Sequence, residues 1–185
     1  MPTLPFVMRP PLPAILAAAL LGGCASFSPD GGFDAVQQAT RSHLPQEVAW
    51  TRDAASRSAV QARIDALLDE PLAADDAVQI ALLNNPGLQA AFDTLGIAEA
   101  ERVAASRLPN PGFSIGRLTR GSEVEWERSL HLNLARLLTL PMRAGIEQRL
   151  FEQSQRAVVL DVLRLAADTR KAYYAAVSAR QTAHY

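Results

Sequence analysis

The sequence has a single cysteine, Cys24, and only three histidines in 185 residues. One cysteine excludes an intramolecular disulfide and a cysteine-rich zinc site, so the thiol of Cys24 is inert, reactive or modified. His43, His131 and His184 are isolated, with no other histidine or cysteine at ligand spacing. The sequence therefore predicts no metal site.

The sequence also lacks a large net charge of either sign and lacks catalytic motifs. The formal net charge is -1, and no basic stripe is available to neutralise phosphates, so nucleic acid is not an expected partner. Neither a Gly-x-Ser-x-Gly nucleophile motif nor a glycine-rich phosphate-binding fingerprint occurs. Glu123, Glu125 and Glu127 could be taken for a paired acid and base, but their alternate spacing favours a solvated or lumen-lining strand face. We expect no enzymatic activity and no cofactor.

The N-terminal apolar run, residues 14–21, is too short to cross a bilayer as a helix, which needs about 20 residues. With Arg9 before it and two glycines after it, the run makes residues 1–23 a secretory signal peptide. Leu21-Gly22-Gly23-Cys24 resembles a bacterial lipobox, which implies a thioether-linked lipid on Cys24. Ala25 is compatible with sorting to the outer membrane. The alternative is an ordinary signal peptide that contains a cysteine.

The 185-residue chain has enough apolar residues for a core, at 49% hydrophobic and 20% charged. Residues 24–53 contain the turn cluster Ser28-Pro29-Asp30-Gly31-Gly32 and few periodic apolar positions, so we expect a lipidated, extended tether. Helical spacing of apolar residues then predicts a short amphipathic helix over about 54–70, which ends before Pro71.

A second helical period covers about 74–107, with Asp75 and Asp76 at its start. Pro86 lies inside this segment, and because the period continues beyond the proline, we expect a kinked and nearly continuous helix. Leu108-Pro109-Asn110-Pro111-Gly112 then ends it, since proline lacks an amide donor and disfavours the helical conformation of its predecessor.

Two strands are predicted next, over about 113–118 and 124–134, joined by a turn around Gly121. The second strand alternates: Val124, Trp126, Leu130, Leu132 and Leu134 share one parity, and only Arg128 interrupts them. The other parity is polar, with Glu123, Glu125, Glu127, Ser129, His131 and Asn133. A sheet over a soluble core and a membrane barrel both give this alternation.

The last predicted element is a long helix over about 141–185, because after Pro141 no strong helix breaker follows. Its apolar residues form two adjoining stripes, so helices should pack on both of its sides. Some 40 residues would extend about 60 Å, which suits a bundle, a coiled coil or a helical tunnel.

The order of these elements resembles the N-terminal portion of TolC-family outer-membrane efflux proteins. The similar segments cover about 72–185 and are 77–88 with its Asn-Asn-Pro, 104–111 before the first strand, 129–134 and 168–177. The resemblance implies a mainly α fold with a β-hairpin, in which long helices form a periplasmic tunnel and strands join an outer-membrane barrel. It also implies lipid-facing Val124, Trp126, Leu130, Leu132 and Leu134, and lumen-facing Glu125, Glu127, His131 and Asn133.

By the same resemblance, residues 54–185 would be the first helix-hairpin-helix unit of a subunit that forms a homotrimer with four strands per subunit. Its partners would be outer-membrane lipid, a periplasmic adaptor and an inner-membrane pump. Family members are more than twice as long and contain a second unit, and no internal repeat is visible here, so we expect an incomplete, truncated subunit. The expected function is a passive export duct for small solutes, either drugs or metal ions. The alternative is a non-transporting periplasmic lipoprotein, a scaffold or adaptor held by Cys24.

Overall fold

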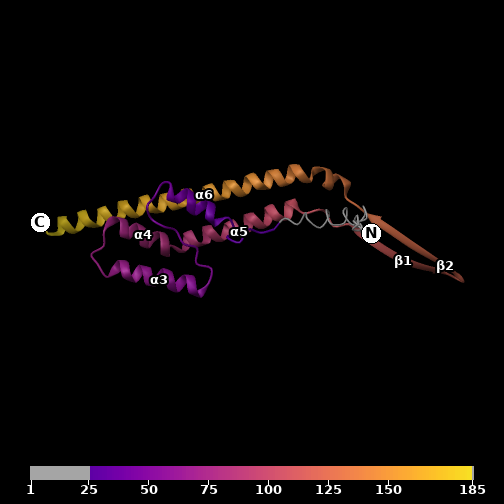
Figure 1. Cartoon of the computed structure of the whole chain (residues 1–185), viewed down its shortest axis with the longest axis horizontal. Coiled ribbons are helices and arrows are strands. Elements are labelled where there is room, and N and C mark those ends of the chain that lie inside the picture. The colour runs from indigo at the N-terminus through magenta and orange to yellow at the C-terminus, as the bar shows by residue number, and fades with distance from the viewer. Residues whose placement is uncertain (1–25, 185) are drawn as a thin grey trace, which may run out of the picture.

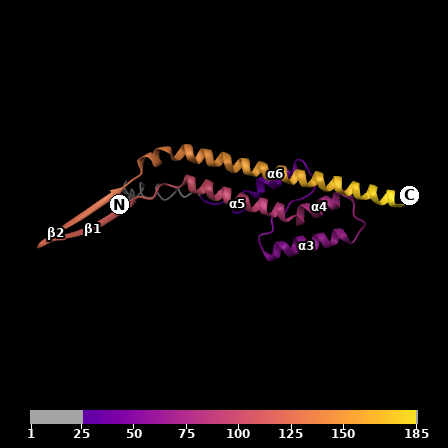
Figure 2. The same cartoon turned by 180° about the vertical axis from the view of Figure 1, so that it is seen from behind.

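A computed structural model describes residues 26–184 and shows a mainly helical chain with one antiparallel hairpin. Helix α6 runs the length of the helical part of the molecule, α4 and α5 lie beside it, and the hairpin projects beyond the end of α6 that is far from the C-terminus (Figures 1 and 2). The predicted fold class, mainly α with a β-hairpin, is confirmed. The predicted signal peptide and the predicted lipidation site, Cys24, lie outside the described residues. In chain order, the elements are α2 (Phe33–Arg41), α3 (Ala54–Leu68), α4 (Ala74–Asn84), α5 (Pro86–Ser106), β1 (Gly112–Arg120), β2 (Glu123–His131) and α6 (Leu134–His184).

The second predicted helical region is two helices, because a single residue, Asn85, leaves the helical conformation. Its φ is -76° and its ψ is 116°, and its side-chain oxygen accepts a hydrogen bond from the amide of Leu88 at 3.0 Å. Pro86 occupies the first turn of α5, where the missing amide costs no intrahelical bond. The Asn-Pro pair therefore both ends α4 and begins α5.

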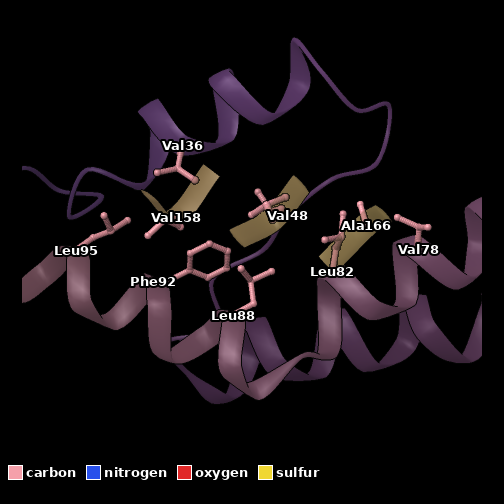
Figure 3. Close-up of a cluster of buried hydrophobic side chains, with 10 residues drawn as sticks. Val36, Val48, Val78, Leu82, Leu88, Phe92, Leu95, Val158 and Ala166 are labelled. Carbon is pink, nitrogen blue, oxygen red and sulfur yellow. The ribbon is translucent and has the colours of Figure 1, made fainter. Parts of the chain in front are cut away.

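The core lies between α2, α4, α5 and the middle of α6 (Figure 3). Phe92 is completely buried, and the ring of Phe33 packs edge-on against it with centroids 4.9 Å apart. Each large apolar side chain removed from water in this way contributes about 1.5–3 kcal/mol. The cluster consists of Val36, Val48, Val78, Leu82, Leu88, Phe92, Leu95, Val158, Val162 and Ala166.

The prediction of an extended tether over 24–53 is wrong for residues 26–53. Helix α2 forms there, and both Val36 and Val48 belong to the core. The glycine-rich turn folds the chain back instead of extending it, since Gly31 and Gly32 both adopt left-handed φ values, of 64° and 81°. Gly32 also lies so close to Phe151 of α6 that an added Cβ would be 2.3 Å from the ring.

Two glutamines hold the segment that follows α2. Gln79 of α4 accepts from the amide of Glu47 at 3.0 Å and donates to its carbonyl at 2.9 Å. Gln89 of α5 accepts from the amide of Thr51 at 2.9 Å and donates to the Ala49 carbonyl at 2.8 Å. These amide side chains replace the partner strand that an extended backbone otherwise needs. They fix residues 47–51 across the junction between α4 and α5.

Helix α3 begins at a capping box formed by Asp53 and Ser56, whose side chains each bond the other residue's amide. Its bounds agree closely with the predicted 54–70. Ile64 is its buried residue, and the helix packs mainly against α4. An exposed ion pair of 2.6 Å joins Arg63 to Glu47. The helix is therefore an outer layer that leaves most of its surface in solvent.

Helix α6 begins at Leu134, seven residues earlier than the predicted 141, and β2 ends at His131, before the predicted 134. The side-chain oxygen of Asn133 accepts from the Arg136 amide at 2.9 Å, so this asparagine caps the helix. Pro141 lies inside α6, where it lacks the amide for one intrahelical hydrogen bond and its ring crowds the carbonyl four residues earlier. The strand assignment of Leu132, Asn133 and Leu134 is consequently wrong.

Candidate functional site: the projecting hairpin

The hairpin consists of two nine-residue strands in register from Gly112 opposite His131 to Arg120 opposite Glu123. Gly121 allows the reversal with a left-handed φ of 63°. At about 3.4 Å per residue, the strands extend roughly 30 Å beyond the helices. Two strands alone form the sheet, so their outer edges have no neighbouring strand within residues 26–184.

One face of the hairpin is apolar except for two arginines and a threonine. Residues that are opposite each other in an antiparallel pair point to the same face. The register therefore puts Phe113 with Leu130 near the base and Trp126 with Arg117 in the middle. Phe113 is 66% exposed, Trp126 59% and Leu130 69%, so nothing in the described chain covers this surface. The apolar face consists of Phe113, Ile115, Arg117, Thr119, Val124, Trp126, Arg128 and Leu130.

The opposite face is mainly polar, with three glutamates on β2 and with Leu118 and Arg120 opposite two of them on β1. Glu123, Glu125, Glu127 and His131 lie on it, as their common parity predicts. His131 Nε2 is 3.2 Å from Ser129 Oγ, and the Ser129 hydroxyl in turn contacts that of Ser114. In residues 26–184 no ion pair involves the three glutamates. Arg120 lies opposite Glu123 on this face, but the two side chains form no ion pair in the described chain, so the three glutamates keep free acceptor oxygens.

The separation of Val124, Trp126 and Leu130 from Glu125, Glu127 and His131 is present in the structure, while the medium that each face meets stays a prediction. Leu132, Asn133 and Leu134 do not extend these faces, because they lie beyond β2.

Arg117 was missed by the sequence analysis, which found only Arg128 among the apolar positions. Its guanidinium lies 5.8 Å from the centre of the Trp126 ring, close enough for a cation–π contact. The position of the turn could have revealed this contact. With the turn at Gly121 and Ser122, the hairpin register places Arg117 opposite Trp126.

An exposed apolar stripe on α6 begins next to the hairpin. Leu134 is 62% exposed, Leu138 81% and Met142 69%, and they recur at every fourth residue. Such spacing places them along one ridge of the helix. Ile146 and Leu150 continue this stripe farther along α6, so exposed hydrophobic side chains are found both on the hairpin and on the part of α6 nearest to it. Exposed patches of this kind mark contacts with membranes or other chains.

A buried carboxylate lies on the hairpin-side half of α5. Glu99 is 1% exposed, and one of its oxygens accepts from the Ser28 amide at 2.7 Å, the Ser28 hydroxyl at 2.6 Å and Arg102 Nη2 at 2.9 Å. Burial alone raises the pKa of Glu99. The hydrogen bonds from Ser28 and Arg102 lower it by more than burial raises it, so the pKa of Glu99 is below its ordinary value. Arg102 also lies 5.3 Å from the centre of the Phe151 ring. Sequence reasoning missed this cluster because no periodic pattern connects residues so far apart.

The far end of the body is fastened by contacts between α6 and the start of α4. Arg170 Nη2 is 2.7 Å from Asp75 Oδ1, and the Tyr173 hydroxyl donates to the Leu72 carbonyl at 2.8 Å. Arg170 also lowers the pKa of Asp75. Beyond Tyr173 the rest of α6 is exposed up to His184.

No catalytic arrangement emerges from the other surfaces of residues 26–184. An open groove between α2 and α6 is apolar, with Ala35, Ala39, Val159 and Leu160 among its lining residues. Within the same residues, His, Cys, Asp and Glu side chains do not gather into a group that could hold a metal ion. His43 borders the groove and His131 lies on the hairpin, far apart on the chain.

None of the helices in the described part of the chain combines the length and the hydrophobicity needed to span a membrane. Comparison with known proteins identifies no matching family model, curated protein or solved structure.

Proposed function

We propose that this chain is the outer-membrane channel component of a tripartite efflux system, a passive export duct for small solutes such as drugs or metal ions. A single observation carries the proposal: a hairpin with an uncovered apolar face and an acidic opposite face projects from the end of a long helical rod. Lipidation of Cys24 would attach the same end region to the outer membrane.

The hairpin has the dimensions of a membrane-spanning β-element. A transmembrane strand needs about 9–11 residues when it is tilted by about 45°, and β1 and β2 have nine each. Hydrocarbon cannot satisfy free backbone donors and acceptors, so both outer edges need further strands. Other copies of the chain or further strands of a longer subunit would supply them, which agrees with the proposed homotrimeric barrel.

The opposite faces of the hairpin suit lipid and water respectively. In a barrel, lipid-facing and lumen-facing side chains alternate along each strand. Val124, Trp126 and Leu130 would face lipid, and Glu125, Glu127 and His131 would line the lumen. A ring of carboxylates from several copies attracts cations and repels anions. The proposed duct is therefore selective for neutral or cationic solutes.

Arg117 and Arg128 are the residues that the proposed lipid face must accommodate. An arginine at the middle of a bilayer costs about 2–4 kcal/mol on a barrel surface, and the cost falls towards the headgroups. Their long side chains can extend to the headgroup region, and Arg117 also has the indole ring of Trp126 beside it. The two arginines thus set the depth at which the hairpin is least costly to insert.

The helices supply the periplasmic part of the duct. With 51 residues, α6 extends about 76 Å. Its exposed apolar side chains at both ends, including Leu138 and Val177, provide surfaces for neighbouring copies and for the proposed adaptor. The inner-membrane pump would supply the energy and the solute, so the duct itself performs no chemical step.

The proposal is tested by labelling the hairpin tip from outside the cell. Ser122→Cys puts a thiol next to the turn, and Ser58→Cys puts one on the exposed surface of α3. We expect a membrane-impermeant thiol reagent to label the tip variant in intact cells, and the α3 variant only after the outer membrane is permeabilised. Tip labelling that also requires permeabilisation would leave the hairpin in the periplasm and favour the scaffold alternative.

A further inference from the structure

The apolar face of the hairpin carries two arginines that have no anionic partner within residues 26–184. Arg117 lies opposite Trp126, and Arg128 lies opposite Ile115, nearer the base of the hairpin. Both arginines are exposed, and none of the ion pairs in this part of the chain involves either of them. A guanidinium keeps its charge in proteins and has several N–H donors. The face therefore presents two positive charges that the described chain does not neutralise.

The hairpin register makes Arg117 and Arg128 diagonal neighbours on adjacent strands. Diagonal positions on one face of an antiparallel pair are about 7–8 Å apart, which long side chains can bridge. Two like charges at this separation repel each other, and the repulsion grows where lipid replaces water, because the dielectric constant is lower there. A single anion between the two guanidiniums removes that repulsion. The arrangement therefore suits one anionic group that contacts both arginines.

The surroundings of the two arginines favour an anion that has an apolar body. The three glutamates of β2 lie on the opposite face, so they do not face the pair. The other positions of the face are uncharged and, except for the threonine, apolar: Phe113, Ile115, Thr119, Val124, Trp126 and Leu130. A small hydrated anion would cover none of these side chains. A lipid with an anionic headgroup places charge on the arginines and hydrocarbon on the apolar residues.

Trp126 indicates how a headgroup and the arginines can meet. The Arg117 guanidinium lies 5.8 Å from the centre of the indole ring. Tryptophan is enriched at the level of the headgroups, because its ring is apolar at one end and polar at the other. The bilayer also thins locally around an arginine, which brings phosphate groups towards the guanidinium. A lipid phosphate can therefore reach the pair while its acyl chains cover Phe113 and Leu130.

We propose that Arg117 and Arg128 form a binding site for the phosphate group of an anionic phospholipid, whose acyl chains cover the apolar residues of the same face. This inference rests on the proposed membrane location of the hairpin and adds a specific lipid partner to it. Each guanidinium would donate a pair of N–H groups to phosphate oxygens, a geometry that lysine does not reproduce. The bound lipid belongs to the outer surface of the duct and is not a transported solute.

The test measures which lipid lies beside Trp126 in the full-length protein. The Trp50→Phe variant keeps Trp126 as its only tryptophan. It is placed in vesicles of equal parts phosphatidylglycerol, which is anionic, and phosphatidylcholine, which is not. Brominated acyl chains quench tryptophan fluorescence, and one of the two lipids carries them in each sample. We expect brominated phosphatidylglycerol to quench Trp126 several-fold more strongly than brominated phosphatidylcholine.

Substitution of the arginines tests whether they select the lipid. Arg117→Gln combined with Arg128→Gln, in the Trp50→Phe chain, should make quenching by the two brominated lipids equal. The same pair changed to lysine keeps the charge without the bidentate geometry and should keep only part of the preference. Arg120→Gln, on the opposite face, is the matched control and should keep all of it. The readout is a ratio between two lipids, so a change in the depth of Trp126 affects both measurements alike.

The outcomes separate this inference from the proposed function. Equal quenching by both lipids with the two arginines in place would overturn the lipid site and leave the hairpin in the membrane. A preference that survives the double glutamine substitution would also overturn it, because another group would then select the lipid. Loss of the preference when sodium phosphate replaces sodium chloride at equal ionic strength would assign the arginines to a free anion instead. Absence of quenching by either lipid would overturn the membrane location and the lipid site together.

Discussion

The helical body buries its large apolar side chains, whereas the hairpin leaves its own exposed. In the body, which comprises α2 to α5 and the part of α6 that packs on them, Phe92, Leu82 and Val162 are completely buried. In the hairpin, the large apolar side chains are all about half exposed or more, with Leu130 at 69%. The body therefore forms its own core, whereas the hairpin depends on a surrounding that the described chain does not provide.

The two regions also differ in how their backbones are held. In the body, Gln79 of α4 and Gln89 of α5 each form hydrogen bonds with the backbone of residues 47–51. Several independent contacts therefore hold this extended segment in place. The hairpin is held by the hydrogen bonds between β1 and β2, and an isolated two-stranded hairpin is at best marginally stable in water. This difference predicts that equivalent substitutions in the two regions have very different effects.

The largest expected difference concerns a pair of phenylalanines. Phe92→Ala should lower the free energy of unfolding by about 3–5 kcal/mol, because it leaves a cavity in the core. Phe113→Ala on the hairpin should change it by less than about 0.5 kcal/mol. Urea unfolding followed by circular dichroism measures both. Equal losses would show that the hairpin is part of the cooperative core.

A smaller loss is expected from the glutamines that hold residues 47–51. Gln79→Ala leaves both the amide and the carbonyl of Glu47 without their partner, which costs about 1–3 kcal/mol. Gln153→Ala removes an exposed amide side chain from α6 and serves as the matched control, with no change expected. The same unfolding experiment applies, and a neutral Gln79→Ala would mean that water replaces the side chain without loss.

The pH dependence of Glu99 gives the next prediction. Because hydrogen bonds from Ser28 and Arg102 hold its folded-state pKa below the ordinary value, the folded state binds fewer protons here than the unfolded state. Its contribution to stability is complete above the unfolded pKa of about 4.3 and is lost as the pH falls through the folded pKa.

Unfolding titrations between about pH 7 and about pH 3 should therefore show a steeper acid loss for the natural chain than for Glu99→Gln. Glu101→Gln, at an exposed position, should keep the natural slope. Identical slopes for the natural chain and Glu99→Gln would contradict the assigned pKa direction.

The sequence predicts those features of the two regions that depend on regularly spaced apolar residues, and it does not predict the others. The helical spacing of apolar residues correctly predicted α3, α5 and most of α6. The alternation from Val124 to Leu130 correctly predicted the two faces of β2. Apolar burial imposes those periods on the sequence. The contrast between a packed helical part and an exposed strand face was thus partly visible in advance.

The errors arose where local chemistry overrides the pattern. The Gly31-Gly32 turn indicated a loose tether, yet it folds α2 onto α6. Asn133 looked like a strand residue by parity, yet its side chain caps α6. Gln79, Gln89 and Glu99 join residues distant in the chain through side-chain hydrogen bonds, which leave no periodic pattern in the sequence.

The two tryptophans offer the most direct test, since each region contains one: Trp50 is in the body and bonds Asp93 at 2.9 Å, and Trp126 is on the hairpin. The Trp50→Phe variant keeps only the tryptophan of the hairpin, and the Trp126→Phe variant keeps only the tryptophan of the body. The measurement is quenching of their fluorescence by phospholipids with brominated acyl chains, in vesicles that contain the full-length protein. The proposed membrane location of the hairpin predicts strong quenching of Trp126 and almost none of Trp50, whereas equally weak quenching of both would contradict it.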